Sequence, residues 1–247
     1  MTNIIEQLLR DALMVLHSRG FLAHRLDMRI EVRRSQCKNN GYFYTNVALA
    51  LSKNVHKKAY DIAIAIVDAL PTHPFMSAPA VTTIGLIYFY MTPVYRVNLL
   101  NKPLHYLPSH DVKQSMFIAD NDKHTIQYAQ ARTVSLFEQL RAQSFLFEKT
   151  LGASHVDKLT HPYEEDLFFL LSHVIECDKC MGTLGELRQL TYDLRSVANV
   201  LHSYYNAVPI LCEREALRTA RLLLLIGVER ILRYGMALLG MPVLERG

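Results

Sequence analysis

Apolar residues recur every three or four positions along two stretches near the end of the sequence, on either side of Pro209. This period predicts two amphipathic helices, each with one buried stripe. The stripe positions are Leu190, Leu194, Val197, Leu201, Tyr204 and Val208 in the first helix, and Leu217, Ala220, Leu224, Gly227, Ile231, Gly235 and Leu238 in the second. The other side of the second helix carries Arg214, Arg218, Arg221 and Arg233, with Glu229 among them. We therefore expect this helix to pack through one face and to present a basic face that can hold an anion.

The same helical period extends upstream. Four helices are predicted, over residues 125–149, 164–177, 185–207 and 213–239, and the connections between them are short. Helices joined in this way pack as a compact bundle. We therefore expect an all-α domain over residues 124–247.

The first part of the chain mixes two periods. A helix is predicted over residues 3–19, and Gly20 follows it where a left-handed cap belongs. In residues 28–33 apolar and charged side chains alternate, which predicts a half-buried strand. Residues 38–44 pass from turn-forming Lys, Asn and Gly into three aromatic residues. This order favours a hairpin whose second arm is aromatic.

Two more helices are predicted over residues 46–52 and 57–70. The stretch 81–91 is rich in β-branched and aromatic residues and is expected to form the last strand of an antiparallel sheet. Residues 1–91 are therefore predicted to form a small α+β domain. Residues 92–123 show no sustained period and contain three prolines, so we expect a linker there. The predicted fold class is α+β, with an antiparallel sheet and helices followed by a helical bundle.

Composition limits the classes of function. The chain has 247 residues, 50% of them hydrophobic, which is enough for two ordinary cores. It has no apolar run long enough to span a membrane, its first residues lack a signal-peptide pattern, and its four cysteines form no dense framework. We expect a cytoplasmic protein with reduced thiols. The net charge is +4, with 11 Lys or Arg against 6 Asp or Glu in residues 1–100. This modest excess fits a polyanion partner, and a solvated surface is the ordinary alternative. We expect neither a membrane nor DNA as a partner.

Three segments carry family motifs in order. Residues 41–53, GYFYTNVALALSK, are similar to the pattern G-D-Y-Q-S-N-V-A-M-x-L-A-K, and residues 126–132, IQYAQAR, are similar to V-Q-Y-A-H-A-R. Residues 192–242 are similar to the order Y-x-L, F-Y, P-V, R-L and L-L-G-x-x-x-P, with Tyr-Tyr in place of Phe-Tyr, Val-Pro in place of Pro-Val, and Leu-Leu-Gly-Met-Pro at the close. These patterns occur in arginyl-tRNA synthetases, in the N-terminal additional domain and in the DALR-type anticodon-binding domain. The chain resembles that family over about residues 1–91 and 120–246.

The resemblance also implies that the catalytic domain is missing. In the family, several hundred residues of catalytic domain separate the two binding domains, whereas here only residues 92–123 do. The H-x-G-H and K-M-S-K motifs, which hold the ATP phosphates in that class of enzyme, do not occur. Phosphoryl chemistry has no evident route without such an electrostatic cradle, and no spacing of Ser, His and Asp indicates a nucleophilic triad. We therefore expect no enzymatic activity and no cofactor.

For the N-terminal domain, the resemblance implies contact with the elbow of a tRNA. The family uses an aromatic residue and its polar neighbour, which correspond here to Phe43 and Tyr44, and Asn46 belongs to the same candidate surface. Tyr44 stands where the family has glutamine, and Tyr42 stands where it has aspartate. An amide contact to a base edge is thereby lost, while the capacity for stacking grows.

For the helical domain, the resemblance implies contact with the anticodon loop. Helical spacing places Tyr128, Arg132 and Ser135 on the side opposite the apolar residues of the same helix. Loop bases are read by stacking on aromatic or guanidinium planes and by hydrogen bonds to their edges. The RNA-binding candidates of this domain are Tyr128, Arg132, Ser135, Tyr204, Tyr205, Arg218 and Arg221.

Each candidate has an ordinary structural alternative. A tyrosine in a bundle usually packs with its hydroxyl at the rim, and at least one of Tyr204 and Tyr205 has to pack in the core. Arg132 has an equal alternative as a brace to a carboxylate such as Glu164 or Glu165. For the arginines of the last helix, the alternative is a solvated face.

One further spacing indicates metal chemistry. His173, Cys177 and Cys180 have the spacing of half a zinc site on a helix. A closed structural site needs four ligands, so Cys212 or His155 would have to complete it. We favour the alternative, two small apolar thiols beside a histidine, and expect no metal.

These observations lead to hypotheses of different classes. The first is a noncatalytic tRNA-binding protein for arginine tRNA, acting as adaptor, chaperone or competitor through elbow and anticodon-loop contacts. The second is a protein-interaction module, derived from a synthetase, that has lost RNA binding. The third is the tRNA-recognition subunit of a separate enzyme, with a synthetase or a tRNA-modifying enzyme as partner. A single positive, exposed face that Tyr128, Arg132, Arg218 and Arg221 share with the basic side of the N-terminal domain would favour the first.

Overall fold

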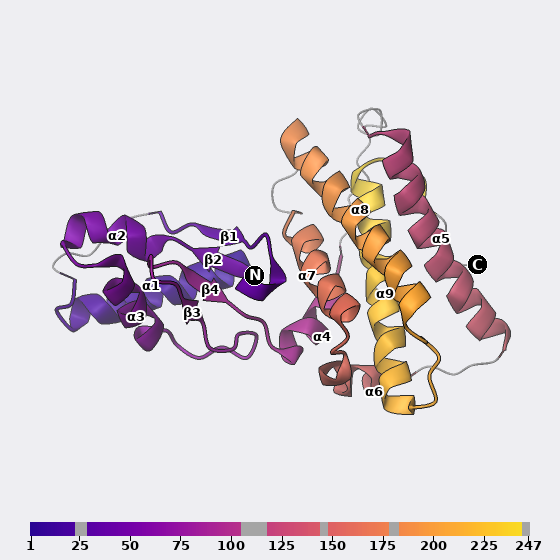
Figure 1. Ribbon diagram of the computed structural model, residues 1–247, viewed down its shortest axis with the longest axis horizontal. Coiled ribbons are helices and arrows are strands. Elements are labelled where there is room, and N and C mark those ends of the chain that lie inside the picture. The colour runs from indigo at the N-terminus through magenta and orange to yellow at the C-terminus, as the bar shows by residue number, and fades with distance from the viewer. Residues whose placement is uncertain (23–28, 105–117, 144–147, 178–182, 244–247) are drawn as a thin grey trace. The chain divides into compact units, whose positions relative to one another are not determined.

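The computed structural model describes residues 1–22, 29–104, 118–143, 148–177 and 183–243. It divides into two compact units, Met1–Tyr95 and Arg96–Gly247, and each is considered by itself. The first combines helices with a small sheet, and the second is helical (Figure 1). The predicted α+β class with a helical second part is confirmed.

The first unit is built on a four-stranded antiparallel sheet. Its strands are β1 (Val32–Arg34), β2 (Phe43–Thr45), β3 (Ala80–Val81) and β4 (Ile87–Phe89), in the order β1-β2-β4-β3. Successive side chains of a strand point to opposite faces. Phe43, Ile87 and Phe89 are therefore buried on one face, while Tyr44 and Tyr88 are half buried on the other.

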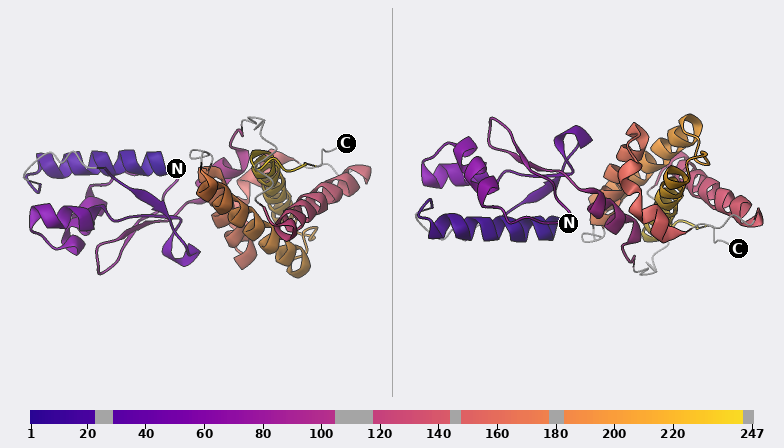
Figure 2. Two further views of the ribbon diagram at one scale, coloured as in Figure 1. Left: turned by 90° about the horizontal axis from the view of Figure 1, so that it is seen from above. Right: turned by 90° about the horizontal axis from the view of Figure 1, so that it is seen from below.

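Three helices complete this unit: α1 (Thr2–Ser18), α2 (Val47–Val55) and α3 (Ala59–Ala69). Helix α1 packs against α3 and β1, and it runs along one side of the strands in both views of Figure 2. The core is formed by fully buried apolar side chains from helices and strands. They include Ile5, Leu9, Phe43, Leu51, Ile62, Ile66, Ile87 and Phe89.

The predicted end of the first helix is confirmed. Gly20 has a φ of 70°. Its N–H donates to the His17 carbonyl at 3.0 Å, and the Phe21 N–H donates to the Leu16 carbonyl at 2.9 Å. This pair of bonds is a Schellman motif, which satisfies carbonyls that the helix leaves free. The start of the predicted alternation, Met28, lies outside the described residues.

The predicted hairpin is also confirmed. A short 3₁₀ helix, η1 (Lys38–Asn40), joins β1 to β2, which pair antiparallel. Gly41 follows this turn with a φ of 78°. The Lys, Asn and Gly residues therefore form the turn between β1 and β2 that their composition predicts.

Residues 81–91 form a hairpin rather than the single strand that we predict from the sequence. Strands β3 and β4 flank a turn in which the Gly85 N–H donates to the Thr82 carbonyl at 2.8 Å. The Leu86 N–H donates to Thr82 Oγ1 at 3.0 Å, and Gly85 has a φ of 89°. High β-propensity runs through the whole stretch and conceals the turn, which only Gly85 signals.

Gly41 and Gly20 allow a matched test of a close backbone approach. Both have left-handed φ values, but a Cβ on Gly41 would lie 2.6 Å from the Phe89 carbonyl oxygen, whereas one on Gly20 would have nothing within 4 Å. We expect Gly20→Ala to lower the free energy of unfolding by about 1 kcal/mol. Gly41→Ala should cost roughly twice as much, because β2 must also shift away from β4. Urea unfolding of both variants checks this, and equal losses would contradict the close approach.

The second unit is a helical bundle. Its long helices are α5 (Asp120–Ala142), α7 (Pro162–Cys177), α8 (Leu184–Ala207) and α9 (Glu215–Leu238). Its short ones are α6 (Lys149–Ser154), the 3₁₀ helix η3 (Val156–Lys158) and the part of α4 (Pro93–Asn101) from Arg96 onward. Helices α5 and α8 run in one direction, and α7 and α9 run in the other (Figure 1). The predicted helix over residues 125–149 is wrong in extent, since α5 starts earlier and ends at Ala142, and α6 is separate.

The predicted linker contains a helix, α4, and also the first turn of α5. Arg230 of α9 holds the end of α4: its Nη1 and Nη2 donate to the carbonyls of Leu100 at 2.6 Å and Lys102 at 2.8 Å. Leu100 also packs over Gly227, where a Cβ would overlap with it. Because these contacts join residues up to 130 positions apart, the local sequence pattern does not indicate the helix.

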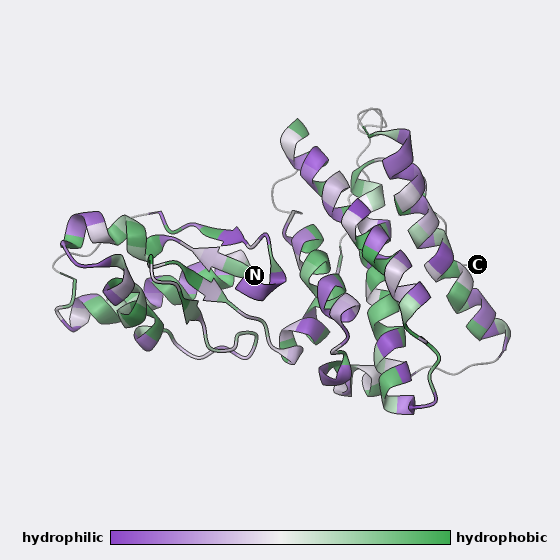
Figure 3. Cartoon of the chain, in the orientation of Figure 1, coloured by the Kyte–Doolittle hydropathy of each residue, from purple (hydrophilic) through white to green (hydrophobic). Residues whose placement is uncertain are grey.

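Helix α9 is the central helix of this unit. It contacts α5, α6, α7 and α8, and residues 219–229 are all buried. Figure 3 shows hydrophobic positions along most of its length. The predicted basic face is therefore wrong, since Arg221 is 8% exposed and Glu229 is 1% exposed. The spacing separates arginines from apolar residues, but it does not show that other helices cover both sides.

Candidate functional site

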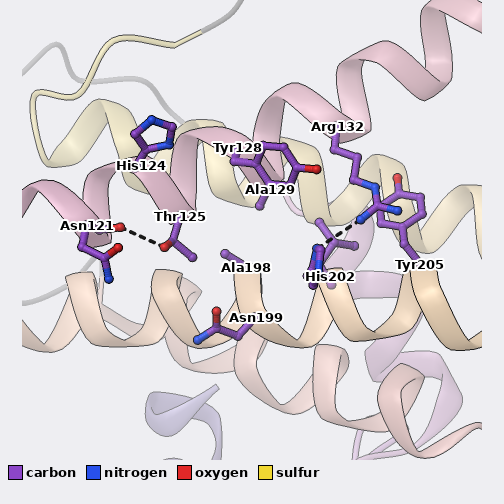
Figure 4. Close-up of a pocket in the computed structure, with 11 residues that line it drawn as sticks. Asn121, His124, Thr125, Tyr128, Ala129, Arg132, Ala198, Asn199, His202 and Tyr205 are labelled. Carbon is purple, nitrogen blue, oxygen red and sulfur yellow. Dashed lines mark hydrogen bonds between the residues drawn. The ribbon is translucent and has the colours of Figure 1, made fainter.

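A groove lies between the parallel helices α5 and α8, and it contains a hollow of about 310 Å³ (Figure 4). Ala129, Ala198 and Leu201 supply apolar atoms to its wall. Polar and aromatic residues supply the rest: Asn121, His124, Thr125, Tyr128 and Arg132 from α5, and Asn199, His202 and Tyr205 from α8. Three of the predicted RNA-binding residues, Tyr128, Arg132 and Tyr205, meet in this groove.

Arg132 is held by residues of α8. Its guanidinium carbon lies 4.6 Å from the ring centroid of Tyr205, a cation–π arrangement. Its Nη1 lies 3.1 Å from His202 Nδ1, and its Nη2 donates to Asn206 Oδ1 at 3.4 Å. The alternative in which Arg132 braces Glu164 does not hold, because Glu164 pairs with Arg221. Among the described residues Arg132 has no carboxylate partner, so its charge is available to a ligand.

The hydrogen-bond cluster around His202 is one acceptor short. Arg132 can only donate, so His202 Nδ1 has to accept, and the neutral ring then carries its proton on Nε2. Nε2 lies 3.2 Å from the amide nitrogen of Asn206, which is also a donor. Rotating that amide turns its oxygen to His202 and its nitrogen to Arg132 instead. In either arrangement two N–H groups face each other, and an acceptor from a ligand would relieve the mismatch.

Two tyrosines add aromatic surface to the groove. Tyr128 is 54% exposed, and its ring centroid lies 6.3 Å from that of His202. The hydroxyl oxygen of Tyr205 is buried and has no partner in the part of the chain that the structure describes. Burial raises the pKa of the Tyr205 phenol, so the hydroxyl stays protonated and is a further donor without an acceptor. The groove therefore combines stacking surfaces with an excess of donors.

Tyr204 and Arg221 lie in the core, not in the groove. Both bond to Glu164 Oε1: Tyr204 Oη donates at 2.9 Å and Arg221 Nε at 2.9 Å. Glu164 Oε2 accepts from the His161 N–H at 2.9 Å, and Arg221 Nη1 donates to the Pro209 carbonyl at 2.9 Å. Burial and the Glu164 charge raise the pKa of Tyr204. This network joins α7, α8 and α9, and it makes the predicted RNA contacts of Tyr204 and Arg221 untenable.

Two other predicted residues also lie apart from the groove lining. Arg218 is half buried, and its Nη1 donates to the Cys212 carbonyl at 3.2 Å in the turn before α9. Ser135 is exposed, about one turn beyond Arg132 on α5. The exposed face on which Tyr128 and Arg132 would lie together with Arg218 and Arg221 is therefore not formed, because Arg221 is buried.

Sequence reasoning missed the polar residues of α8. His202 and Asn206 are exposed and bond to Arg132, and Asn199 lines the hollow. The signal was their spacing of three and four residues with Arg195, on the side of α8 opposite its apolar stripe. That spacing indicates a binding surface only when a second helix lies beside α8, and the sequence does not show that α5 is that helix.

In the first unit, the two aromatic candidates, Phe43 and Tyr44, lie on opposite faces of the sheet. Phe43 is fully buried, so the predicted stacking of RNA on this ring is wrong. Tyr44 is half buried on the other face, with its ring centroid 5.7 Å from that of Tyr88. Arg33 pairs with Tyr44 in register across β1 and β2, and Asn46 is half buried just before α2. Tyr44 therefore stays a candidate for contact with RNA, next to an exposed arginine.

The metal hypothesis reaches outside the described residues, because Cys180 lies there. Within the described ranges, no group of three or more His, Cys, Asp or Glu side chains is placed to hold a metal ion. In those same ranges, no helix is long and apolar enough to cross a membrane.

Comparison with known proteins gives two family matches. Residues 2–91 match the arginyl tRNA synthetase N terminal domain, and residues 126–246 match the DALR anticodon binding domain. The arginine–tRNA ligase of Legionella pneumophila strain Corby is 41% identical over 127 residues, which are 51% of this chain and 22% of that protein. For the ligase of Coxiella burnetii strain RSA 331, the identity is 35% over 126 residues, 51% of this chain and 22% of that protein. No solved structure gives a significant match.

The matches define what the chain retains. It spans about a fifth of the length of these ligases, 22% in both. The two matched domains are separated only by residues 92–125. The chain therefore belongs with the arginyl-tRNA synthetase family as a synthetase-like protein that joins the N-terminal domain to a DALR anticodon-binding domain and lacks the catalytic domain between them.

Proposed function

We propose that this chain binds tRNA without aminoacylating it, that arginine tRNA is its preferred ligand, and that the groove between α5 and α8 receives the anticodon loop. The observation that carries this proposal is the meeting of Tyr128, Arg132 and Tyr205 in one hollow of a DALR-type domain. Such a set of planes suits unstacked loop bases, whose faces are apolar and whose edges carry acceptors.

The excess of donors supports a nucleic-acid ligand. The cluster formed by Arg132, His202 and Asn206 is one acceptor short, and the Tyr205 hydroxyl has no partner in the described chain. Base carbonyls, ring nitrogens and phosphate oxygens are all acceptors. A peptide surface rich in carboxylates would also supply acceptors, but it would leave the exposed face of Tyr128 without a flat partner.

The proposed role is binding alone. The two family matches leave only residues 92–125 between them, and the motifs that the resemblance associates with the ATP phosphates do not occur in the sequence. A protein of this kind would act as an adaptor, a chaperone or a competitor of the full synthetase. Tyr44, beside Arg33, is the candidate for a second contact, at the tRNA elbow.

Titration of the purified chain with arginine tRNA and with a mixed tRNA pool, at 50 and 200 mM salt, tests the proposal. We expect tighter binding to arginine tRNA and an affinity that falls at least tenfold at the higher salt, because phosphate contacts release counterions. An equal affinity for both RNA samples would remove the preference for arginine tRNA. Absence of binding at 50 mM salt would contradict the proposal and favour a protein-interaction module.

A further inference from the structure

A second hollow, of about 270 Å³, lies beside the first turns of α5 and α8. Its apolar wall includes Ile118 and Leu187, and its polar rim includes Asp122, Arg188, Tyr192 and Arg195. None of these residues belongs to the hollow at Arg132. Both hollows lie between the same two helices, so they are two stations along one groove.

The second hollow repeats the chemistry of the first. The Arg195 guanidinium carbon lies 5.5 Å from the ring centroid of Tyr192, and Tyr192 is 56% exposed. Arg195 Nη1 also bonds Asp122 Oδ1 at 3.1 Å, which fixes the guanidinium and offsets its charge. An exposed tyrosine beside a fixed guanidinium offers a flat surface to a base.

Arg188 supplies the free positive charge at this station. Its side chain is exposed one helical turn before Tyr192, and no ion pair is found for it among the described residues. Asp122 offsets the charge of Arg195 but not that of Arg188, so Arg188 is the better suited of the two to a phosphate, and the exposed ring of Tyr192 is suited to a base.

We propose that this second hollow is a further base-stacking site for the same single-stranded RNA, with Tyr192 as the stacking plane and Arg188 as the phosphate contact. The inference rests on the proposed function. Thirteen residues of α8 separate Tyr192 from Tyr205, and at about 1.5 Å per residue they span roughly 20 Å. Even at the ~3.4 Å rise of a fully stacked strand the two stations lie at most about six nucleotides apart, and fewer nucleotides span them when loop bases are splayed onto the protein.

This spacing gives a length test. An anticodon stem-loop reaches both stations, whereas an oligonucleotide of about three nucleotides reaches only one of them. We expect Tyr192→Leu to weaken binding of the stem-loop about 5- to 30-fold, since loss of a stacking plane costs about 1–2 kcal/mol. Tyr192→Phe keeps the plane and should bind as the unchanged chain does. Arg188→Ala should lower the salt dependence of log K by about one unit of slope.

Both tyrosine variants are measured in the full chain by fluorescence titration with a labelled stem-loop, after unfolding curves show that they fold. Tyr192 is exposed, so the fold should not depend on it. Equal affinity of Tyr192→Leu and the unchanged chain overturns the second station but leaves the proposed function in place. No binding by the unchanged chain overturns the proposed function, and the second station with it.

Discussion

Replacing Glu164 with leucine lowers the free energy of unfolding of the helical unit by about 3–5 kcal/mol, because it leaves the Arg221 guanidinium buried without its carboxylate. The pair is well inside the protein, because only 1% of the Glu164 side chain and 10% of the Arg221 side chain are exposed. The same substitution also removes the acceptor for Tyr204 and for the His161 N–H. Urea unfolding at neutral pH measures the loss.

Two further variants separate the causes. The double variant Glu164→Leu with Arg221→Met removes both charges together, and it should be more stable than either single variant. Tyr204→Phe removes only one hydrogen bond to a charged group and should cost about 1.5–3 kcal/mol. Glu138, which is exposed on α5, is the matched control, and Glu138→Leu should change the stability by less than about 0.5 kcal/mol. A loss below about 1 kcal/mol for Glu164→Leu would contradict the structural role of the network.

Replacing Arg132 with alanine weakens binding of arginine tRNA about 30- to 100-fold, which corresponds to about 2–3 kcal/mol. This side chain provides both a guanidinium plane over Tyr205 and an uncompensated charge in the groove. Tyr128→Leu removes the exposed ring and should weaken binding by a similar factor. Filter binding or fluorescence anisotropy with full-length tRNA measures both.

The lysine variant distinguishes the two contributions of Arg132. Arg132→Lys keeps the charge but loses the planar fork, so it should keep the salt dependence and recover little of the affinity. Arg214, exposed just before α9 and away from the lining of the groove, is the matched control, and Arg214→Ala should bind nearly as the unchanged chain does. If Arg132→Ala and Arg214→Ala weaken binding equally, the groove is not the binding site.

Tyr204 and Tyr205 show how far the sequence predicts the site. The helical period places Tyr204 in the buried stripe of its helix, and the family motif places both tyrosines near RNA. The structure agrees with the period, since Tyr204 is buried and Tyr205 lines the groove. A motif records which residues occur together, whereas the period reports which side of the helix packs.

Other features of the fold and of the groove depend on contacts between residues that are distant in the sequence. Arg221 falls on the polar side of its predicted helix, and only the fold brings Glu164, 57 positions earlier, to its side. The end of α4 depends on Arg230, and the role of Arg132 depends on His202, 70 positions later. Local patterns predict the long helices and the first hairpin of the sheet, but not α4, the β3–β4 turn or the partners of the charged side chains, which depend on packing.

Nuclease footprinting of arginine tRNA bound to the full chain tests whether the groove between α5 and α8 receives the anticodon loop. We expect protection of the anticodon loop, which is lost with Arg132→Ala and kept with Arg214→Ala. Binding that protects no loop nucleotide, or protection that survives Arg132→Ala, would contradict the assignment of the groove between α5 and α8 as the anticodon-loop site.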